Sequence, residues 1–182
     1  MEIINTPIQD LLIIKPRVFG DERGFFCETY NEKTYQNLNL NLKFCQDNQS
    51  KSNYGVIRGL HYQLNPQSQS KLVSVAIGSV WDVAVDLRKN SPTFGQWYGI
   101  ELTAENHLQF LIPKGFAHGF SVLSETALFT YKCDNFYSPE LERGIMYNDP
   151  TLDIDWKIPS DKAIISGKDL NHPMFDDAEM NF

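Results

Sequence analysis

The sequence predicts an all-β fold, an antiparallel barrel of the jelly-roll kind with a few short peripheral helices. Three observations predict it: two adjacent runs of alternating side chains joined by a tight turn, a series of short extended segments at regular spacing, and helix signals that are weak and peripheral. The mouth of such a barrel is a natural site for a small ligand.

The strongest signal is a hairpin in the middle of the chain. Side chains alternate along Lys71–Ile77, and Gly78-Ser79 then offers a tight turn. In Val80–Arg88 the alternation gives two faces, one carrying Trp81, Val83, Val85 and Leu87, and the other carrying Val80, Asp82, Ala84, Asp86 and Arg88.

Further short strands are expected over Trp97–Leu102, Leu108–Ile112, Gly119–Leu123 and Ala127–Tyr131. Turn residues separate these segments, at Ser91-Pro92, Pro113–Gly115 and Ser138-Pro139. Asn31 can cap a short helix over Glu32–Leu38, and another helix is expected near the C-terminus.

Composition bounds the class of protein. The chain has 182 residues, of which 42% are hydrophobic and 21% charged, so we expect one globular domain over residues 1–182. The net charge of −7 argues against nucleic-acid binding, and no apolar run reaches the length of a membrane span. The start of the chain shows no signal peptide, and Cys27, Cys45 and Cys133 form no disulfide or zinc pattern, so we expect a cytoplasmic protein with free cysteines.

Two of the four histidines stand in unusual settings. His61 lies in a strand-like segment beside Gln63, and His118 follows a Pro-Gly turn among apolar residues. Burial favours a neutral imidazole, which is the form that a general base needs. A single buried histidine is more often a core residue than a catalyst, but two in one barrel favour a site. His107 is expected at the surface, and His172 is given no role.

Three cations and one phenol are further candidates. Arg23, Arg58 and Lys71 would suit a diphosphate if their strands converge, although most Arg and Lys side chains are solvated surface charges. Tyr131 ends a predicted strand, and its phenol could donate a proton, although alone it is more simply a core or surface aromatic.

Several segments occur together in an order and spacing that match one known family. The longest are Phe19–Phe26 (FGDERGFF), Gly55–Gln63 (GVIRGLHYQ) and Ile112–Phe120 (IPKGFAHGF). Shorter ones are Gln46–Ser50, Lys71–Val73, Asp82–Arg88, Ser91–Gly95, Tyr131-Lys132, Asn148–Pro150 and Ser166–Asp169. This series, from about residue 15 to about residue 173, resembles the dTDP-4-dehydrorhamnose 3,5-epimerases of dTDP-L-rhamnose synthesis.

The resemblance implies a cupin jelly roll that acts as a homodimer on a dTDP-linked 4-keto-6-deoxy sugar, with no metal and no organic cofactor. It implies that His61 is the general base, Asp169 the carboxylate that orients it, Tyr131 the general acid and Lys71 the cation near the developing enolate. His118 would lie beside the sugar. Other substrate-binding positions would be Arg23, Glu28, Gln46, Asn48, Arg58, Glu142 and Lys168. Arg23 and Glu28 would reach the site of the neighbouring subunit.

Three alternatives stay open. A metal-dependent cupin would share the later Pro-x-Gly-x-x-His pattern of Pro113–His118, but its earlier His-x-His pair reads His61-Tyr62-Gln63 here. A sugar-binding cupin without catalysis would need no His, Tyr and Lys set. A C3-only or C5-only epimerase would share the catalytic groups, and no altered motif distinguishes it.

Overall fold

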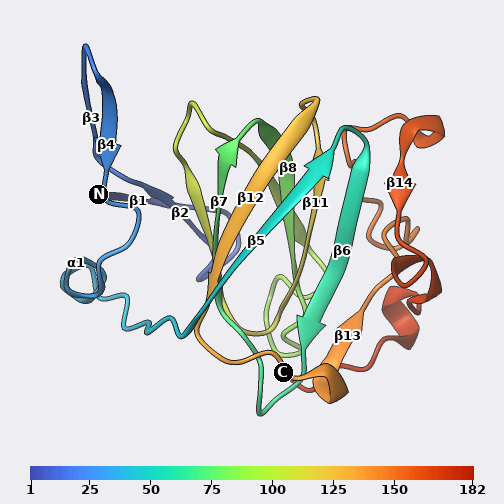
Figure 1. Ribbon diagram of the computed structural model, residues 1–182. Helices are drawn as coiled ribbons and strands as arrows, with labels where there is room; N and C mark the ends of the chain where they lie inside the picture. The colour runs from blue at the N-terminus through green and yellow to red at the C-terminus, as the bar shows by residue number, and fades with distance from the viewer.

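The computed structural model describes residues 1–182 and consists mainly of two facing β-sheets, which confirms the predicted all-β jelly roll (Figure 1). The first sheet has the order β1 (Glu2–Asn5), β2 (Leu12–Lys15), β10 (Gln109–Ile112), β7 (Lys71–Ile77), β12 (Thr126–Cys133), β5 (Gln46–Asn53). The second has the order β13 (Glu142–Gly144), β6 (Val56–Gln63), β11 (Phe116–Val122), β8 (Ser79–Asp86), β9 (Trp97–Thr103). Neighbours in both sheets are antiparallel, and the short β14 (Ile164–Ile165) pairs parallel with β6.

A separate hairpin projects from the barrel. It is formed by β3 (Val18–Asp21) and β4 (Gly24–Cys27), which pair only with each other (Figure 1). Its aromatic side chains are largely exposed to solvent, since Phe25 is 63% and Phe26 68% exposed. We refer to Val18–Cys27 as the arm.

The expected helix after the arm is confirmed. α1 covers Glu32–Asn37, and the Asn31 side chain accepts hydrogen bonds from the backbone N–H groups of Lys33 and Thr34. The C-terminal part has only short 3₁₀ turns, η1 to η4, over Pro139–Leu141, Ser160–Lys162, Asp169–Asn171 and Phe175–Asp177. No helix is long and apolar enough to cross a bilayer.

Two apolar clusters hold the barrel together. The first lies between the sheets and includes Val73, Phe110 and Phe129. The second lies on the outer face of the second sheet, where Val83, Val85 and Leu87 pack against the C-terminal segment. Strand β8 is therefore buried on both faces, which explains why both faces of the predicted strand carry apolar residues.

Some predicted strand limits are wrong in ways that matter for the site. β11 begins at Phe116 rather than Gly119, so His118 lies inside a strand. β12 continues to Cys133, so Tyr131 lies within a strand and not at its end. Both side chains are thereby fixed by backbone pairing on two sides, β11 between β6 and β8, and β12 between β5 and β7.

Candidate active site

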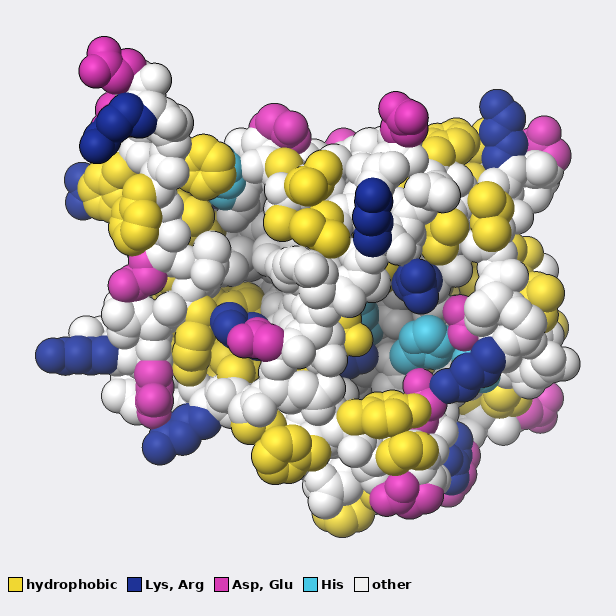
Figure 2. Space-filling view, in the orientation of Figure 1, with side chains coloured by type: hydrophobic (Ala, Val, Ile, Leu, Met, Phe, Trp, Pro, Cys, Tyr) yellow, Lys and Arg dark blue, Asp and Glu magenta, His cyan; other side chains and the backbone are white.

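The candidate site lies between the two sheets. Two adjoining hollows of about 100 and 220 Å³ share His61 from β6, Lys71 from β7 and Tyr131 from β12. Figure 2 shows histidine side chains in a hollow of the surface with cationic side chains around it. The sequence-predicted candidates that the structure brings to these hollows are Gln46, Asn48, Arg58, His61, Lys71, His118, Tyr131 and Glu142.

Strand register brings the two unusual histidines together. His118 on β11 is the register partner of His61 on β6. The strands come unusually close at this point, because a Cβ on Gly59, whose φ is +123°, would collide with the backbone of His118 and Gly119. Glycine at position 59 is thus required for the approach that places both imidazoles at one site.

His61 forms a pair with Asp169 of η3. Its Nε2 lies 2.8 Å from Asp169 Oδ1, and the Gly59 N–H points at Oδ2 from 3.5 Å. Burial opposes ionisation of Asp169, but the hydrogen bond and charge of His61 and the Gly59 N–H hold its pKa below the ordinary value. An ionised carboxylate only accepts, so Nε2 carries the proton and Nδ1 carries the lone pair.

A second histidine–carboxylate pair lies deeper in the barrel. His118 Nε2 lies 3.1 and 3.0 Å from the two oxygens of Asp82, and both side chains are buried. Burial raises the pKa of Asp82 and lowers that of His118, while their mutual attraction opposes both shifts. Burial also lowers the pKa of Lys71, against the attraction of the carboxylates of Asp82 and Glu142.

The Tyr131 phenol is set up to hold its proton. Burial raises its pKa, and the negative charge of Glu142 acts in the same direction, while the charge of Arg58 opposes both. Tyr131 belongs to the first sheet and His61 to the second, so a proton donor and a proton acceptor approach the same hollow from facing sheets.

Polar side chains form the rim. Lys168 Nζ lies 2.5 Å from Glu142 Oε2, and the Tyr137 hydroxyl donates to the same oxygen at 2.8 Å. The Gln46 amide donates to Asn48 Oδ1 at 3.0 Å. Arg58 is exposed and donates through Nε to the Ser52 hydroxyl at 3.1 Å, which leaves the rest of its guanidinium for an anion.

Two predicted binding residues lie away from this hollow in the single chain. The Arg23 side chain is 84% exposed at the tip of the arm and pairs with Asp21. The Glu28 carboxylate accepts hydrogen bonds from Asn31 and Thr34 at the start of α1. Neither lines the two hollows that His61, Lys71 and Tyr131 share.

Three residues of this neighbourhood were missed in the sequence. Asp82 lies between Val80 and Ala84 on the inward face of β8, and a charge between apolar neighbours was a usable signal. Tyr137 lies after the last predicted strand, and no sequence pattern marked it as a site residue. His172 was given no role, but its ring centroid lies 5.6 Å from that of His61. His172 is far from His61 in the sequence, so only the three-dimensional structure reveals that the two rings are close.

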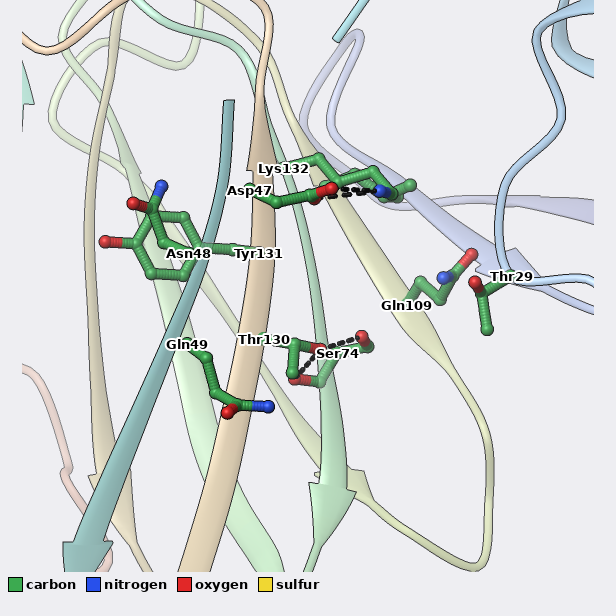
Figure 3. A pocket seen from close by; sticks show the side chains of 10 residues that line it. Thr29, Asp47, Asn48, Gln49, Ser74, Gln109, Thr130, Tyr131 and Lys132 are labelled. Carbon is green, nitrogen blue, oxygen red and sulfur yellow. Dashed lines mark hydrogen bonds and ion pairs between the residues drawn. The ribbon is translucent and has the colours of Figure 1, made fainter. Parts of the chain in front are cut away.

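A further hollow of about 400 Å³ marks the other side of the first sheet. Figure 3 shows Asn48 and Tyr131 on one side of β5 and β12, and Ser74, Thr130 and the Asp47–Lys132 ion pair on the other. Side chains alternate along β12, so Tyr131 and Thr130 point to opposite sides of the sheet, although Asn48 and Tyr131 also border this hollow.

Known proteins with the same fold and sequence pattern were found. The family model for dTDP-4-dehydrorhamnose 3,5-epimerase matches residues 5–177. The enzyme of that name from Shigella flexneri is 53% identical over 180 residues, which cover 98% of each chain. A crystal structure of the Elizabethkingia anophelis enzyme is 59% identical with a TM-score of 0.93 and covers 97% of each chain.

A third relative was solved with a ligand. The epimerase from Legionella pneumophila in complex with dTDP-4-keto-L-rhamnose is 53% identical with a TM-score of 0.92, over 96% of this chain and 93% of that one. Family model, relatives and fold agree over nearly the whole chain. This protein belongs to the dTDP-4-dehydrorhamnose 3,5-epimerase family.

Proposed function

We propose that this chain inverts C3 and C5 of dTDP-4-dehydro-6-deoxy-D-glucose and forms dTDP-4-dehydro-L-rhamnose for dTDP-L-rhamnose synthesis. One observation carries the proposal beyond family membership: His61 and Tyr131 line one hollow from facing sheets, with the partly buried Lys71 in the same hollow. Inversion of a carbon needs a base on one face and an acid on the other.

The reaction begins with a carbon acid. The C4 carbonyl acidifies the hydrogens on C3 and C5, and His61 removes one of them through Nδ1. Asp169 stabilises the imidazolium that forms. The electron pair moves to O4, where the Lys71 ammonium stabilises the enolate. Tyr131 then delivers its proton to the opposite face of the carbon, and solvent restores both groups. The same cycle at the second carbon completes the double inversion.

The rim holds the rest of the substrate. Arg58 and Lys168 are the cations for the diphosphate, and His118 lies deeper, where the sugar would contact it. Gln46, Asn48 and Glu142 supply further polar contacts at the rim. Both sheets and the C-terminal segment contribute residues to this one site, so we assign residues 1–182 to a single domain. We propose that it works without a metal or an organic cofactor.

NMR in deuterated water tests the activity. The purified protein is incubated with dTDP-4-keto-6-deoxyglucose, and C3 and C5 are followed before any reductase is added. We expect deuterium at both carbons, and dTDP-L-rhamnose after a 4-reductase and NADPH are added. Deuterium and inversion at one carbon alone would move the chain to the mono-epimerases, and no exchange at either would refute the assignment.

Tyr131→Phe separates the two proton transfers. Removal of the phenol should slow product formation by roughly 10²-fold or more, while exchange of substrate hydrogens through His61 continues. Tyr54→Phe, in the turn between β5 and β6, is the control that removes a hydroxyl away from the hollow. Equal loss of exchange and product in Tyr131→Phe would contradict the acid role.

We also propose a cytoplasmic homodimer in which the arm and the adjoining Glu28 serve the partner's site. The exposed Phe25 and Phe26 and the position of Arg23 away from its own hollow support the dimer. The three free cysteines support the cytoplasmic location.

Co-expression of Arg23→Ala and His61→Asn chains tests whether the arm of one subunit serves the site of its partner. If arms cross, random pairing restores about a quarter of wild-type activity, because each mixed dimer has one complete site. No restoration above the separate variants would contradict the crossing.

A further inference from the structure

His172 adds a third imidazole to the His61–Asp169 pair. Its Nε2 lies 3.4 Å from Asp169 Oδ1, the same oxygen that His61 Nε2 approaches to 2.8 Å. The two imidazole rings meet edge to face, with an interplanar angle of 79°. One carboxylate oxygen therefore faces two ring nitrogens.

The fold makes room for this ring. Gly144 on β13 is the register partner of His61 on β6, and a Cβ on Gly144 would overlap the His172 ring. The Met146 N–H donates to the Pro173 carbonyl at 2.8 Å, which fixes the backbone directly after His172. The ring thus fills a slot beside the base that only glycine leaves open.

The chemistry of the slot determines the tautomer. His172 Nε2 is buried and makes no regular hydrogen bond, and the acceptor that it faces is Asp169 Oδ1, 3.4 Å away. A lone pair there would face the Asp169 carboxylate and be repelled, whereas an N–H is attracted to it. Burial lowers the pKa of His172, and the Lys168 ammonium and any protonated His61 lower it further against the attraction of Asp169. The ring is a neutral donor, and His61, Asp169 and Lys168 are the titratable groups that act on it.

We infer that His172 is a positioning residue, whose neutral imidazole directs Nε2–H at Asp169 Oδ1 and holds that carboxylate against His61. The inference rests on the proposed roles of His61 and Asp169 and adds a residue that those roles do not require. His172 acts through Asp169 and does not touch the reacting carbons. The His172 N–H faces Asp169 Oδ1, the same oxygen that stabilises the His61 imidazolium. By drawing on the negative charge of that oxygen, His172 weakens the stabilisation of protonated His61.

Two substitutions separate the hydrogen bond from packing. His172→Phe fills the slot with a ring that has no donor, and His172→Gln places an amide N–H near the position of Nε2. We expect His172→Phe to lower kcat/KM by about tenfold, mostly through kcat, and to move the acidic limb of its pH profile to higher pH. His172→Gln should stay within about threefold of wild type with its acidic limb in place.

The opposite pattern would overturn the inference. If His172→Phe keeps wild-type kcat/KM and an unmoved acidic limb, or if both variants lose activity in parallel with Tm, His172 only packs. Asp169→Asn in the same assay tests the proposed His61–Asp169 pair itself. Near-normal turnover in that variant would overturn both the role of Asp169 and the inference on His172, whereas a large loss would leave the role of Asp169 intact. A chelator is present throughout, because the ligand atoms of His61, Asp169 and His172 lie within 4.8 Å of one another. Loss of wild-type activity that Zn²⁺ restores would make the three residues metal ligands and overturn the inference.

Discussion

Two histidine–aspartate pairs lie in the same barrel under different conditions. His61 and Asp169 meet at the mouth, where the His61 side chain is 30% exposed. His118 and Asp82 meet in the interior, where the side chains are 8% and 0% exposed. The residue types and contact distances are similar, so the surroundings account for the difference between the pairs.

The surroundings push the two carboxylates in opposite directions. The pKa of Asp169 is lowered, because its hydrogen bonds outweigh its burial, whereas burial raises the pKa of Asp82. An ionised partner stabilises an imidazolium, which a general base must become. The pair at the mouth therefore suits proton abstraction, and the interior pair suits fixed hydrogen bonding beside the substrate.

The largest expected effect comes from removal of the base at the mouth. His61→Asn should lower kcat by about 10³-fold, because no other group takes the C3 or C5 proton, while dTDP affinity is largely kept. His118→Asn is the matched change in the interior pair and should cost roughly tenfold. Steady-state kinetics and a dTDP titration measure both. If the two variants lose activity equally, the division of roles between the pairs is wrong.

For folding stability we expect the opposite order, with the larger loss from the interior His118–Asp82 pair. Asp82→Ala leaves His118 Nε2 without its buried partner and removes a negative charge that attracts the Lys71 ammonium, and should lower the free energy of unfolding by about 3 kcal/mol. Asp169→Ala should cost about 1 kcal/mol, because water can reach the partly exposed His61. Urea unfolding of both variants gives the comparison, and a larger loss for Asp169→Ala would contradict it.

The smallest effect is a pH dependence of stability. His118 has a lowered pKa in the folded state, so below pH 6.5 the unfolded chain binds a proton at this position that the folded chain resists. The wild type should therefore lose up to about 1 kcal/mol between pH 6.5 and 5.5 relative to His118→Asn. Urea unfolding at the two pH values measures the difference. Parallel behaviour of both proteins would show that His118 is not the group that titrates.

The sequence could predict those parts of the fold that rest on local rules. The Asn31 cap and the hairpin around Gly78 depend on neighbouring residues and are present as expected. β5 could not be found in this way, because Gln46–Asn53 has no apolar residue. It forms a strand because β12 pairs with it along its whole length.

The candidate site likewise contains residues that the sequence predicts and one that only the structure reveals. The family pattern picked out His61, Lys71, His118, Tyr131 and Asp169, and the structure gathers these residues. His172 is near them only because Gly144 leaves a slot beside His61. Residue types and spacing carry no information on such a contact between β6, β13 and η3, so it needed the three-dimensional structure.

Strand β5 has a consequence for how this enzyme can change over time. It pairs with β12 alone, and none of its residues belongs to an apolar cluster. Yet Gln46, Asn48 and Ser50 line the hollows of the candidate active site. If the proposed site is right, we expect substitutions on β5 to alter sugar recognition with little loss of folding stability, which would let new preferences evolve on this strand.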